Sequence, residues 1–165
     1  MNYNYSMKIN VGWFSFTCCE DSTIVFIELM NEKYFEWKKL INFKYFRTLQ
    51  SKNSMTDLDI AFVEGAISNK KEEEMLKKIR KNSKKLVAIG SCACIGSPAN
   101  QRNFFDTKTK KEIQFILDKF DHRDSVSPLS ELVKVDDYIS GCPMDETLFL
   151  KKLNQYIKEF EMINA

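Results

Sequence analysis

Short, continuous apolar runs recur along the chain, and they constrain its fold more than any other feature. Residues 8–16 (KINVGWFSF), 57–63 (DLDIAFV) and 85–90 (KLVAIG) each form such a run. Runs without a polar alternation are typical of strands buried on both faces of a parallel sheet. Residues 43–49 and 132–139 are further strand candidates. The chain is therefore predicted to contain a largely buried sheet.

Helical segments lie between these strands, and the alternation defines the fold class. We predict helices at residues 22–34, 69–83, 107–120 and 145–160. Strands that alternate with helices build a mostly parallel sheet with a helix layer on each face. We therefore expect an α/β three-layer sandwich of the flavodoxin-like type. Its length suits a single domain over residues 1–165, with residues 1–6 as a flexible N-terminus.

The charge balance and the apolar content exclude several classes of protein. Lys and Arg number 25 and Asp and Glu 23, which gives a formal net charge of +2. So close a balance, without a basic stripe, argues against binding to nucleic acid. The apolar stretches are far shorter than a membrane span, and the first residues do not resemble a secretory signal. We expect a cytoplasmic protein without a direct membrane span.

The cysteines fall at positions that suggest a common site. The chain has five, an odd number that argues against a disulfide framework. Cys18 and Cys19 follow the first predicted strand, Cys92 follows the strand at 85–90, and Cys142 follows the last strand. Loops after parallel strands meet at one edge of the sheet, where α/β proteins bind ligands. Four thiols are therefore predicted to converge there.

Converging thiolates suit either a zinc site or an iron–sulfur cluster. Structural zinc sites usually come as two CxxC knuckles, and this chain has none. Adjacent cysteines fit poorly around one small ion, whereas a cubane offers a separate iron at each corner. Gly90, Gly96 and Gly141 would let the backbone approach and direct N–H groups at sulfur. The pattern favours a [4Fe-4S] cluster.

Four motifs carry a family resemblance that spans nearly the whole chain: TCCED (17–21), VEGAI (63–67), GSCACIG (90–96) and GCPMDE (141–146). In this order they resemble the superfamily of [NiFe] hydrogenase small subunits, which also contains the 20-kDa subunit of respiratory complex I. The resemblance implies one [4Fe-4S] cluster held by Cys18 or Cys19 or both, by Cys92 and by Cys142, and we predict that all four are ligands. It also implies an electron-transfer subunit of an oxidoreductase that is not catalytic alone. Its partners would be a large catalytic subunit of the [NiFe] type and further electron-transfer subunits.

The motifs fall between two branches of this superfamily. Hydrogenase small subunits usually have CxxC at the first site, but here Phe16 stands three residues before Cys19. The tandem Cys18-Cys19 is similar instead to the complex I subunit, in which both cysteines are ligands. VEGAI, GCPMDE and the glutamate after Cys19 look more like soluble hydrogenase subunits. We favour the hydrogenase branch and keep a complex I-like quinone oxidoreductase module as the alternative.

The positions of several other residues in the sequence suggest roles for them. Glu20, directly after a ligand position, and Glu64, in VEGAI, are candidates for a proton relay or a partner contact. Cys94 is expected to be a spare thiol that packs as a small apolar residue. Trp13 and Phe14 are expected to be core or interface residues. Together with the loop at 96–105 they are candidates for an apolar interface with the large subunit.

Two alternatives come from other classes of protein. A flavodoxin-like FMN carrier would need a Ser/Thr/Gly-rich phosphate loop after the first strand, where this chain has FTCCED. A thiol redox switch would use Cys18 with Cys19, or Cys92 with Cys94. Vicinal disulfides are strained, however, and the chain has no CxxC motif. The iron–sulfur hypothesis is therefore preferred over both.

Overall fold

A five-stranded sheet forms the centre of the computed structural model, which describes residues 8–163. Its strands lie in the order β2-β1-β3-β5-β7, and every neighbouring pair is parallel. The strands are β1 (Ile9–Ser15), β2 (Ile41–Phe46), β3 (Leu58–Glu64), β5 (Ser83–Ile89) and β7 (Asp137–Ile139). The expected parallel α/β sheet is confirmed. The predicted flexible segment 1–6 lies outside the described residues.

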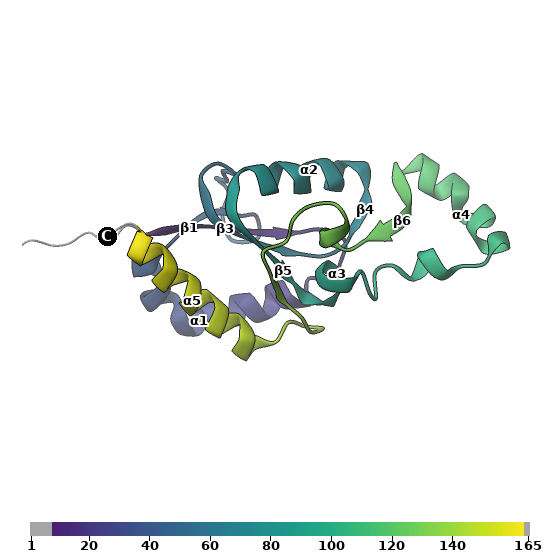
Figure 1. The fold of residues 1–165 in the computed structure, drawn as a ribbon. Coiled ribbons are helices and arrows are strands. Elements are labelled where there is room, and N and C mark those ends of the chain that lie inside the picture. Colours follow the sequence, from purple (N-terminus) through teal and green to yellow (C-terminus); the bar gives the residue numbers. More distant parts are fainter. Residues whose placement is uncertain (1–7, 164–165) are drawn as a thin grey trace, which may run out of the picture.

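Helices cover both faces of this sheet (Figure 1). Helices α1 (Asp21–Leu40) and α5 (Glu146–Ile163) lie on one face, and α2 (Lys70–Lys81) lies on the other. The short helix α3 (Gly90–Ile95) follows β5 at the carboxyl end of the sheet. Within residues 8–163, no helix is both long and apolar enough to cross a membrane.

Each face of the sheet has its own apolar core. On the α1 and α5 face, the ring of Trp13 stacks on Phe26, with 4.2 Å between centroids and 4° between planes. On the α2 face, Phe14 stacks on Tyr45 at 4.3 Å. Trp13 and Phe14 are each only 2% exposed. Their predicted place in the core is therefore confirmed, and their predicted contribution to an interface is wrong, because successive residues of a strand point to opposite, covered faces.

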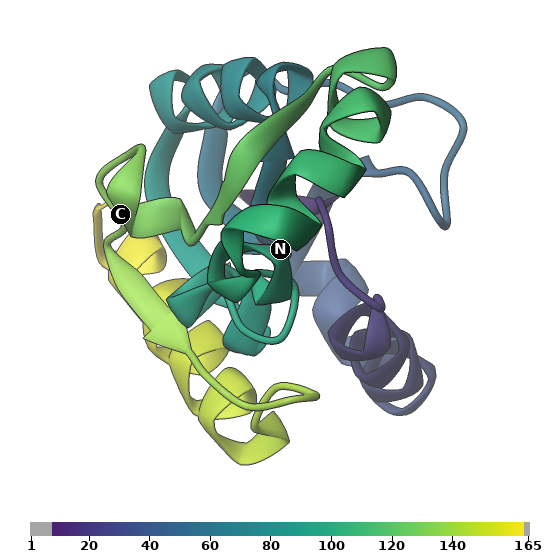
Figure 2. The same cartoon turned by 90° about the vertical axis from the view of Figure 1, so that its right-hand side faces the viewer.

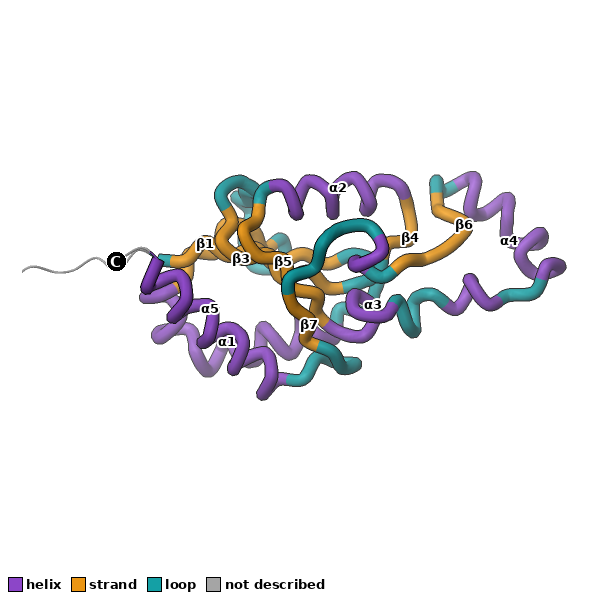
Figure 3. Tube along the Cα trace, in the orientation of Figure 1, coloured by secondary structure: helices purple, strands orange, loops and turns teal. Residues whose placement is uncertain are grey.

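A predicted strand is shorter in the structure, and another strand was not predicted. The strand predicted at 132–139 is limited to β7, because Leu132, Val133 and Val135 pack against the α2-face core from a loop. A strand that the sequence analysis missed, β6 (His122–Ser127), pairs antiparallel with β4 (Ile67–Asn69). Figure 3 shows this small second sheet beside the main one.

The segment from the end of α3 to β6 forms an arm beyond the carboxyl end of the sheet. It contains the 3-10 helix η1 (Gln101–Phe104), helix α4 (Thr107–Lys119) and β6. The 3-10 helix η2 (Leu129–Glu131) follows the arm and returns to the α2-face core, where Leu129 is buried. Helix α4 has nearly the predicted bounds, but it projects past the sheet instead of covering a face (Figure 1). The arm and the strand ends share one side of the molecule, which faces the viewer in Figure 2.

Candidate metal centre

Four of the five cysteines line one small cavity at the carboxyl end of the sheet. Cys18 and Cys19 lie between β1 and α1, Cys92 lies in α3 after β5, and Cys142 lies in the turn between β7 and α5. Parallel strands direct all three segments to the same edge. The predicted convergence of these residues is therefore observed, while their role as cluster ligands stays a prediction.

The four thiols differ in exposure. Cys92 is 8% exposed and packs with Ala66 and Val126 at the base of the site. Cys18 is half-buried, whereas Cys19 and Cys142 are exposed. A group held by all four would be embedded in the chain on one side and open on the other.

The turn that carries Cys142 is fastened to the start of α3. The backbone N–H and the hydroxyl of Ser91 both donate to the carbonyl oxygen of Gly141, at 2.7 and 3.0 Å. Gly141 has a φ of 120°, and a Cβ there would lie 2.4 Å from the carbonyl oxygen of Pro143. Only glycine therefore fits this turn, which holds the Cys142 segment beside the Cys92 segment.

The thiols are close enough to influence one another electrostatically. Burial raises the pKa of Cys18 to about 12, and the negative charges of Glu64 and Cys92 add to the rise. Burial also raises the pKa of Cys92, and the charges of Cys19 and Cys142 raise it further. Thiolates gathered in this way repel each other, so they need positively charged iron or another metal to be stable together.

The donor set fits an iron–sulfur cluster. Iron–sulfur clusters are held by thiolates. This cavity offers four thiols that would lose their protons on binding iron, and no lysine or arginine is among the residues that line it. In residues 8–163, no three His, Cys, Asp or Glu side chains are arranged to hold a single metal ion. The four cysteines are the residues of this chain that would hold a cluster.

Cys94 lies away from the cavity. Its Sγ is 3.7 Å from the carbonyl oxygen of Ala88, and the side chain packs against the α2-face core. Burial raises the pKa of this thiol to about 11. The geometry agrees with the expectation of a spare thiol, because α3 directs Cys92 and Cys94 to different surroundings.

Glu64 caps helix α1 from the end of β3. Its carboxylate accepts hydrogen bonds from the N–H groups of Ser22 at 3.0 Å and Thr23 at 3.1 Å, and from the Thr23 hydroxyl at 2.6 Å. Burial raises the pKa of Glu64, although these hydrogen bonds oppose the rise. The side chain is 3% exposed and thus unavailable for direct contact with a partner. Sequence analysis missed Ser22 and Thr23 as part of the site.

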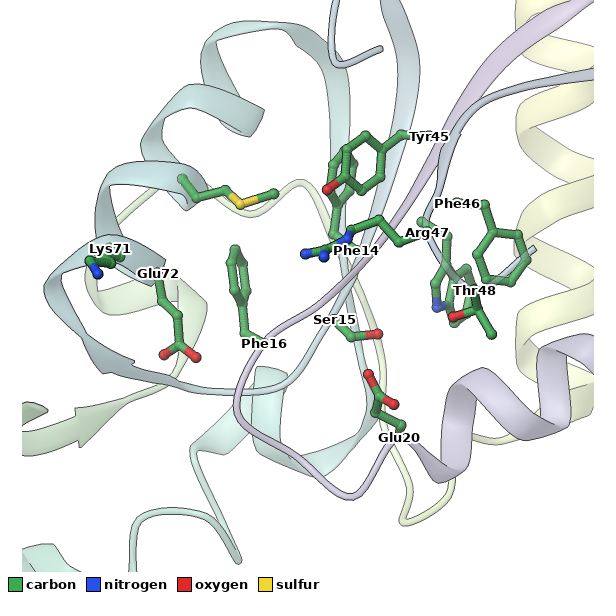
Figure 4. A pocket seen from close by; sticks show the side chains of 12 residues that line it. Phe14, Ser15, Phe16, Glu20, Tyr45, Phe46, Arg47, Thr48, Lys71 and Glu72 are labelled. Carbon is green, nitrogen blue, oxygen red and sulfur yellow. The ribbon is translucent and has the colours of Figure 1, made fainter. Parts of the chain in front are cut away.

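Glu20 lies on the flank of the site. It is exposed, and its backbone is left-handed with a φ of 63°. It lines a neighbouring pocket together with Phe16, Tyr45 and Arg47 (Figure 4), and this pocket contains none of the cysteines. Glu20 is therefore a surface carboxylate beside the candidate centre and not part of its wall.

Apolar side chains are exposed at the end of α3 and in the segment that follows it. Ile95 at the end of α3 is 64% exposed, and Phe104 and Phe105 are 79% and 38% exposed. The last two belong to the loop at 96–105, which was predicted to contribute to an interface. Large exposed apolar side chains of this kind are candidates for contact with another protein.

The fold is similar to that of hydrogenase subunits of known structure. A chain in the crystal structure of an NAD+-reducing [NiFe]-hydrogenase in the H2-reduced state matches with a TM-score of 0.80. The two chains are 22% identical, and the match covers 93% of each. At this identity the likeness establishes the fold.

Two relatives of known name are hydrogenase components. The chain is 27% identical over 177 residues to the NAD-reducing hydrogenase HoxS subunit delta of Cupriavidus necator, covering 93% of this chain and 81% of that protein. It is 29% identical over 109 residues to an iron-sulfur component of the F420-non-reducing hydrogenase of Archaeoglobus profundus, covering 52% of this chain and 34% of that protein. The chain thus spans about a third of the length of this second relative.

A family model covers most of the chain. The model of the NADH ubiquinone oxidoreductase 20 kDa subunit matches residues 18–156. The segment that matches includes all four cysteines of the cavity and the strands that position Cys92 and Cys142. The chain therefore belongs to the family of the NADH ubiquinone oxidoreductase 20 kDa subunit.

Proposed function

We propose that this chain is the electron-transfer small subunit of a cytoplasmic [NiFe]-hydrogenase-type oxidoreductase. One [4Fe-4S] cluster would be held by Cys18, Cys19, Cys92 and Cys142. The observation that carries the proposal is the convergence of four thiols from three separate segments on one cavity. Relatives named as hydrogenase subunits support it.

The residues of the chain have distinct tasks in this site. When bound, the cluster supplies reversible one-electron transfer. Cys92 holds the base of the site, where Ala66 and Val126 exclude water and lower the local polarity. Cys19 and Cys142 hold the open side. Burial and hydrogen bonding around the sulfurs would set the potential.

A large catalytic subunit is the proposed partner. Electron transfer weakens steeply with distance, so the open side of the site must lie close to a second redox centre. Ile95, at the end of the helix that carries Cys92, and Phe104, in η1, are exposed apolar groups that offer contact area. Obligate interfaces of this kind commonly bury more than about 2,000 Å² in total. We expect the large subunit to be of the [NiFe] type, with further electron-transfer subunits beyond it.

A second candidate function is a complex I-like quinone oxidoreductase module. The tandem Cys18-Cys19 favours it, since it is similar to the complex I branch. The two functions differ in the partner subunits that co-purify with the chain and in the electron acceptor that the complex reduces. A hydrogenase complex would reduce a dye with hydrogen, whereas a complex I-like module would pass electrons to a quinone.

Anaerobic purification of the full chain tests the cluster directly. We expect a brown protein with about four iron atoms per chain. Replacing Cys18, Cys19, Cys92 or Cys142 by alanine should lower the iron content, and Cys94→Ala is the matched control. A zinc-containing chain, or a yellow flavin spectrum, would contradict the proposal; an iron-free chain with a reversible disulfide would favour the thiol switch.

Hydrogenase activity tests the second part of the proposal. The chain alone should neither take up nor produce hydrogen, because its sequence contains no CxxC pair that could bind nickel. Co-expression with its large subunit should give both a stable complex and dye reduction by hydrogen. Turnover by the purified chain alone would contradict the assignment.

A further inference from the structure

A buried carboxylate meets the start of the helix that follows Cys18 and Cys19. Glu64 ends β3, a strand whose own loop carries no cysteine. Among the described residues, the side chain of Glu20, the residue before α1, makes no capping hydrogen bond. The Glu64 carboxylate binds the free N–H groups of Ser22 and Thr23 instead. It therefore fixes the helix entry from another strand.

Thr23 extends this connection to β1. Its hydroxyl donates to the Glu64 carboxylate at 2.6 Å and accepts a hydrogen bond from the Trp13 indole N–H at 2.8 Å. The hydroxyl oxygen of Ser15 lies 3.2 Å from the hydroxyl oxygen of Thr23. Both ends of the Cys18-Cys19 segment, β1 and α1, are thus fastened to one carboxylate.

Ser22 extends the connection to the other two cysteine segments. The backbone N–H of Met144 donates to the Ser22 hydroxyl at 3.2 Å, which joins α1 to the turn that carries Cys142. Ser91, next to Cys92, also holds the Cys142 turn, because its N–H and its hydroxyl donate to the carbonyl oxygen of Gly141. A continuous set of hydrogen bonds therefore links all three cysteine segments.

We propose that Glu64, Ser22 and Thr23 form the positioning network of the cluster site, and that Glu64 also sets its potential. The inference rests on the function proposed above. The hydrogen bonds would hold the three segments at the spacing of a cubane. The negative charge of the Glu64 carboxylate, which three hydrogen bonds favour and burial opposes, lines the same cavity. This charge would disfavour the more negative reduced cluster and so lower its potential.

Two variants separate the roles of charge and geometry. Glu64→Gln keeps the shape and removes the charge, so iron content should be retained while the midpoint potential rises. We expect the midpoint potential to rise by about 59 mV. For a one-electron couple this shift changes the ratio of reduced to oxidised cluster tenfold at a fixed potential. Ser22→Ala removes the link to the Cys142 turn. It should speed the loss of one iron in air several-fold, which is seen as a three-iron signal in electron paramagnetic resonance.

Asp59→Asn is the matched control for Glu64→Gln. Asp59 is a buried carboxylate at the other end of the same strand and accepts a hydrogen bond from the Asn10 N–H at 2.8 Å. Its variant should lower stability without moving the potential. An unchanged potential in Glu64→Gln, or an equal shift in Asp59→Asn, would overturn the role of the charge.

The remaining outcomes are also decisive. Should Glu64→Gln fail to fold by circular dichroism, Ser22→Ala decides alone, and loss of iron at the wild-type rate would refute the network. A wild-type chain that binds no cluster would refute the proposed function and this inference with it. A wild-type cluster with unaffected variants would refute the network only.

Discussion

Asp136 fastens the short edge strand β7 to the sheet, and its removal should destabilise the segment that leads to Cys142. Its carboxylate accepts hydrogen bonds from the Leu86 N–H at 2.8 Å and from the Arg80 guanidinium. Its own N–H donates to the carbonyl oxygen of Leu86 at 2.9 Å. Because β7 is only 3 residues long, this side chain supplies much of its attachment. We predict that Asp136→Ala lowers the free energy of unfolding.

The magnitude follows from the two bonds that are lost. Hydrogen bonds to charged groups contribute roughly 1.5–3 kcal/mol each. The Asp136 side chain is 17% exposed, and Arg80 keeps the carbonyl oxygens of Ser83 and Lys84 as partners, so part of the loss is recovered. We expect a net loss of about 2–3 kcal/mol. For a chain of this size that lowers Tm by about 5–10 °C.

The effect should depend on pH in a defined direction. Burial tends to raise the pKa of Asp136, but the Leu86 N–H and the Arg80 guanidinium more than compensate, and the pKa lies below its usual value. A lowered folded-state pKa gives stability that is present above the unfolded-state pKa and is lost as the pH falls through the folded-state pKa. The difference between wild type and Asp136→Ala should be constant near neutral pH and shrink below about pH 4.

Urea unfolding followed by circular dichroism measures both effects, at neutral and acidic pH. Lys134→Ala is the control, since Lys134 lies 3.8 Å from the same carboxylate but is 84% exposed. Its effect should stay within about 0.5 kcal/mol. A loss below about 0.5 kcal/mol in Asp136→Ala would show that β7 is held by other contacts. An equal loss in both variants would refute the assigned bonds.

Three further predictions concern the site, the interface and the core. Cys92→Ala should lower the iron content or give a three-iron cluster, whereas Cys94→Ala should leave iron unchanged; the reverse result in iron analysis would exchange their roles. Phe104→Ser should weaken co-purification with the large subunit, while Phe35→Ser, at an 80% exposed position on α1, should not; equal binding by both would place the interface elsewhere. Phe149→Ala, at a fully buried position, should cost about 3–5 kcal/mol in urea unfolding, and a cost under about 1 kcal/mol would contradict its place in the core.

The sequence was most informative where burial is complete. Strands β3 and β5 were predicted because they are continuous apolar runs, and every residue of β3 is buried. Strand β6 escaped prediction because its sequence, HRDSVS, is mostly polar, and only its last two residues are buried. Its strand character comes from pairing with β4, a contact between segments far apart in the sequence. Residues 132–135 show the converse, since the apolar side chains Leu132, Val133 and Val135 are partly buried against the core from a loop instead of a strand.

The site could be predicted only as far as topology determines it. Parallel strands place their following loops at one edge, and this was sufficient to bring Cys18, Cys92 and Cys142 together. The role of Glu64 as a helix cap was not predictable, because it depends on a contact with Ser22 and Thr23, more than 40 residues away in sequence. Local sequence rules place a capping residue next to its helix.

The exposure of the thiols indicates the side by which an electron would leave the proposed cluster. Cys92 lies at the base of the cavity, 8% exposed, whereas Cys19 and Cys142 are exposed. A cluster bound by these residues would be shielded by the sheet and α3 on one side, so the shortest route for an electron to a partner leaves by the other. A large subunit that docks there would shorten this route and also remove water from the open side. Because water and charge around an iron–sulfur cluster set its potential, assembly and redox tuning would be coupled at one surface.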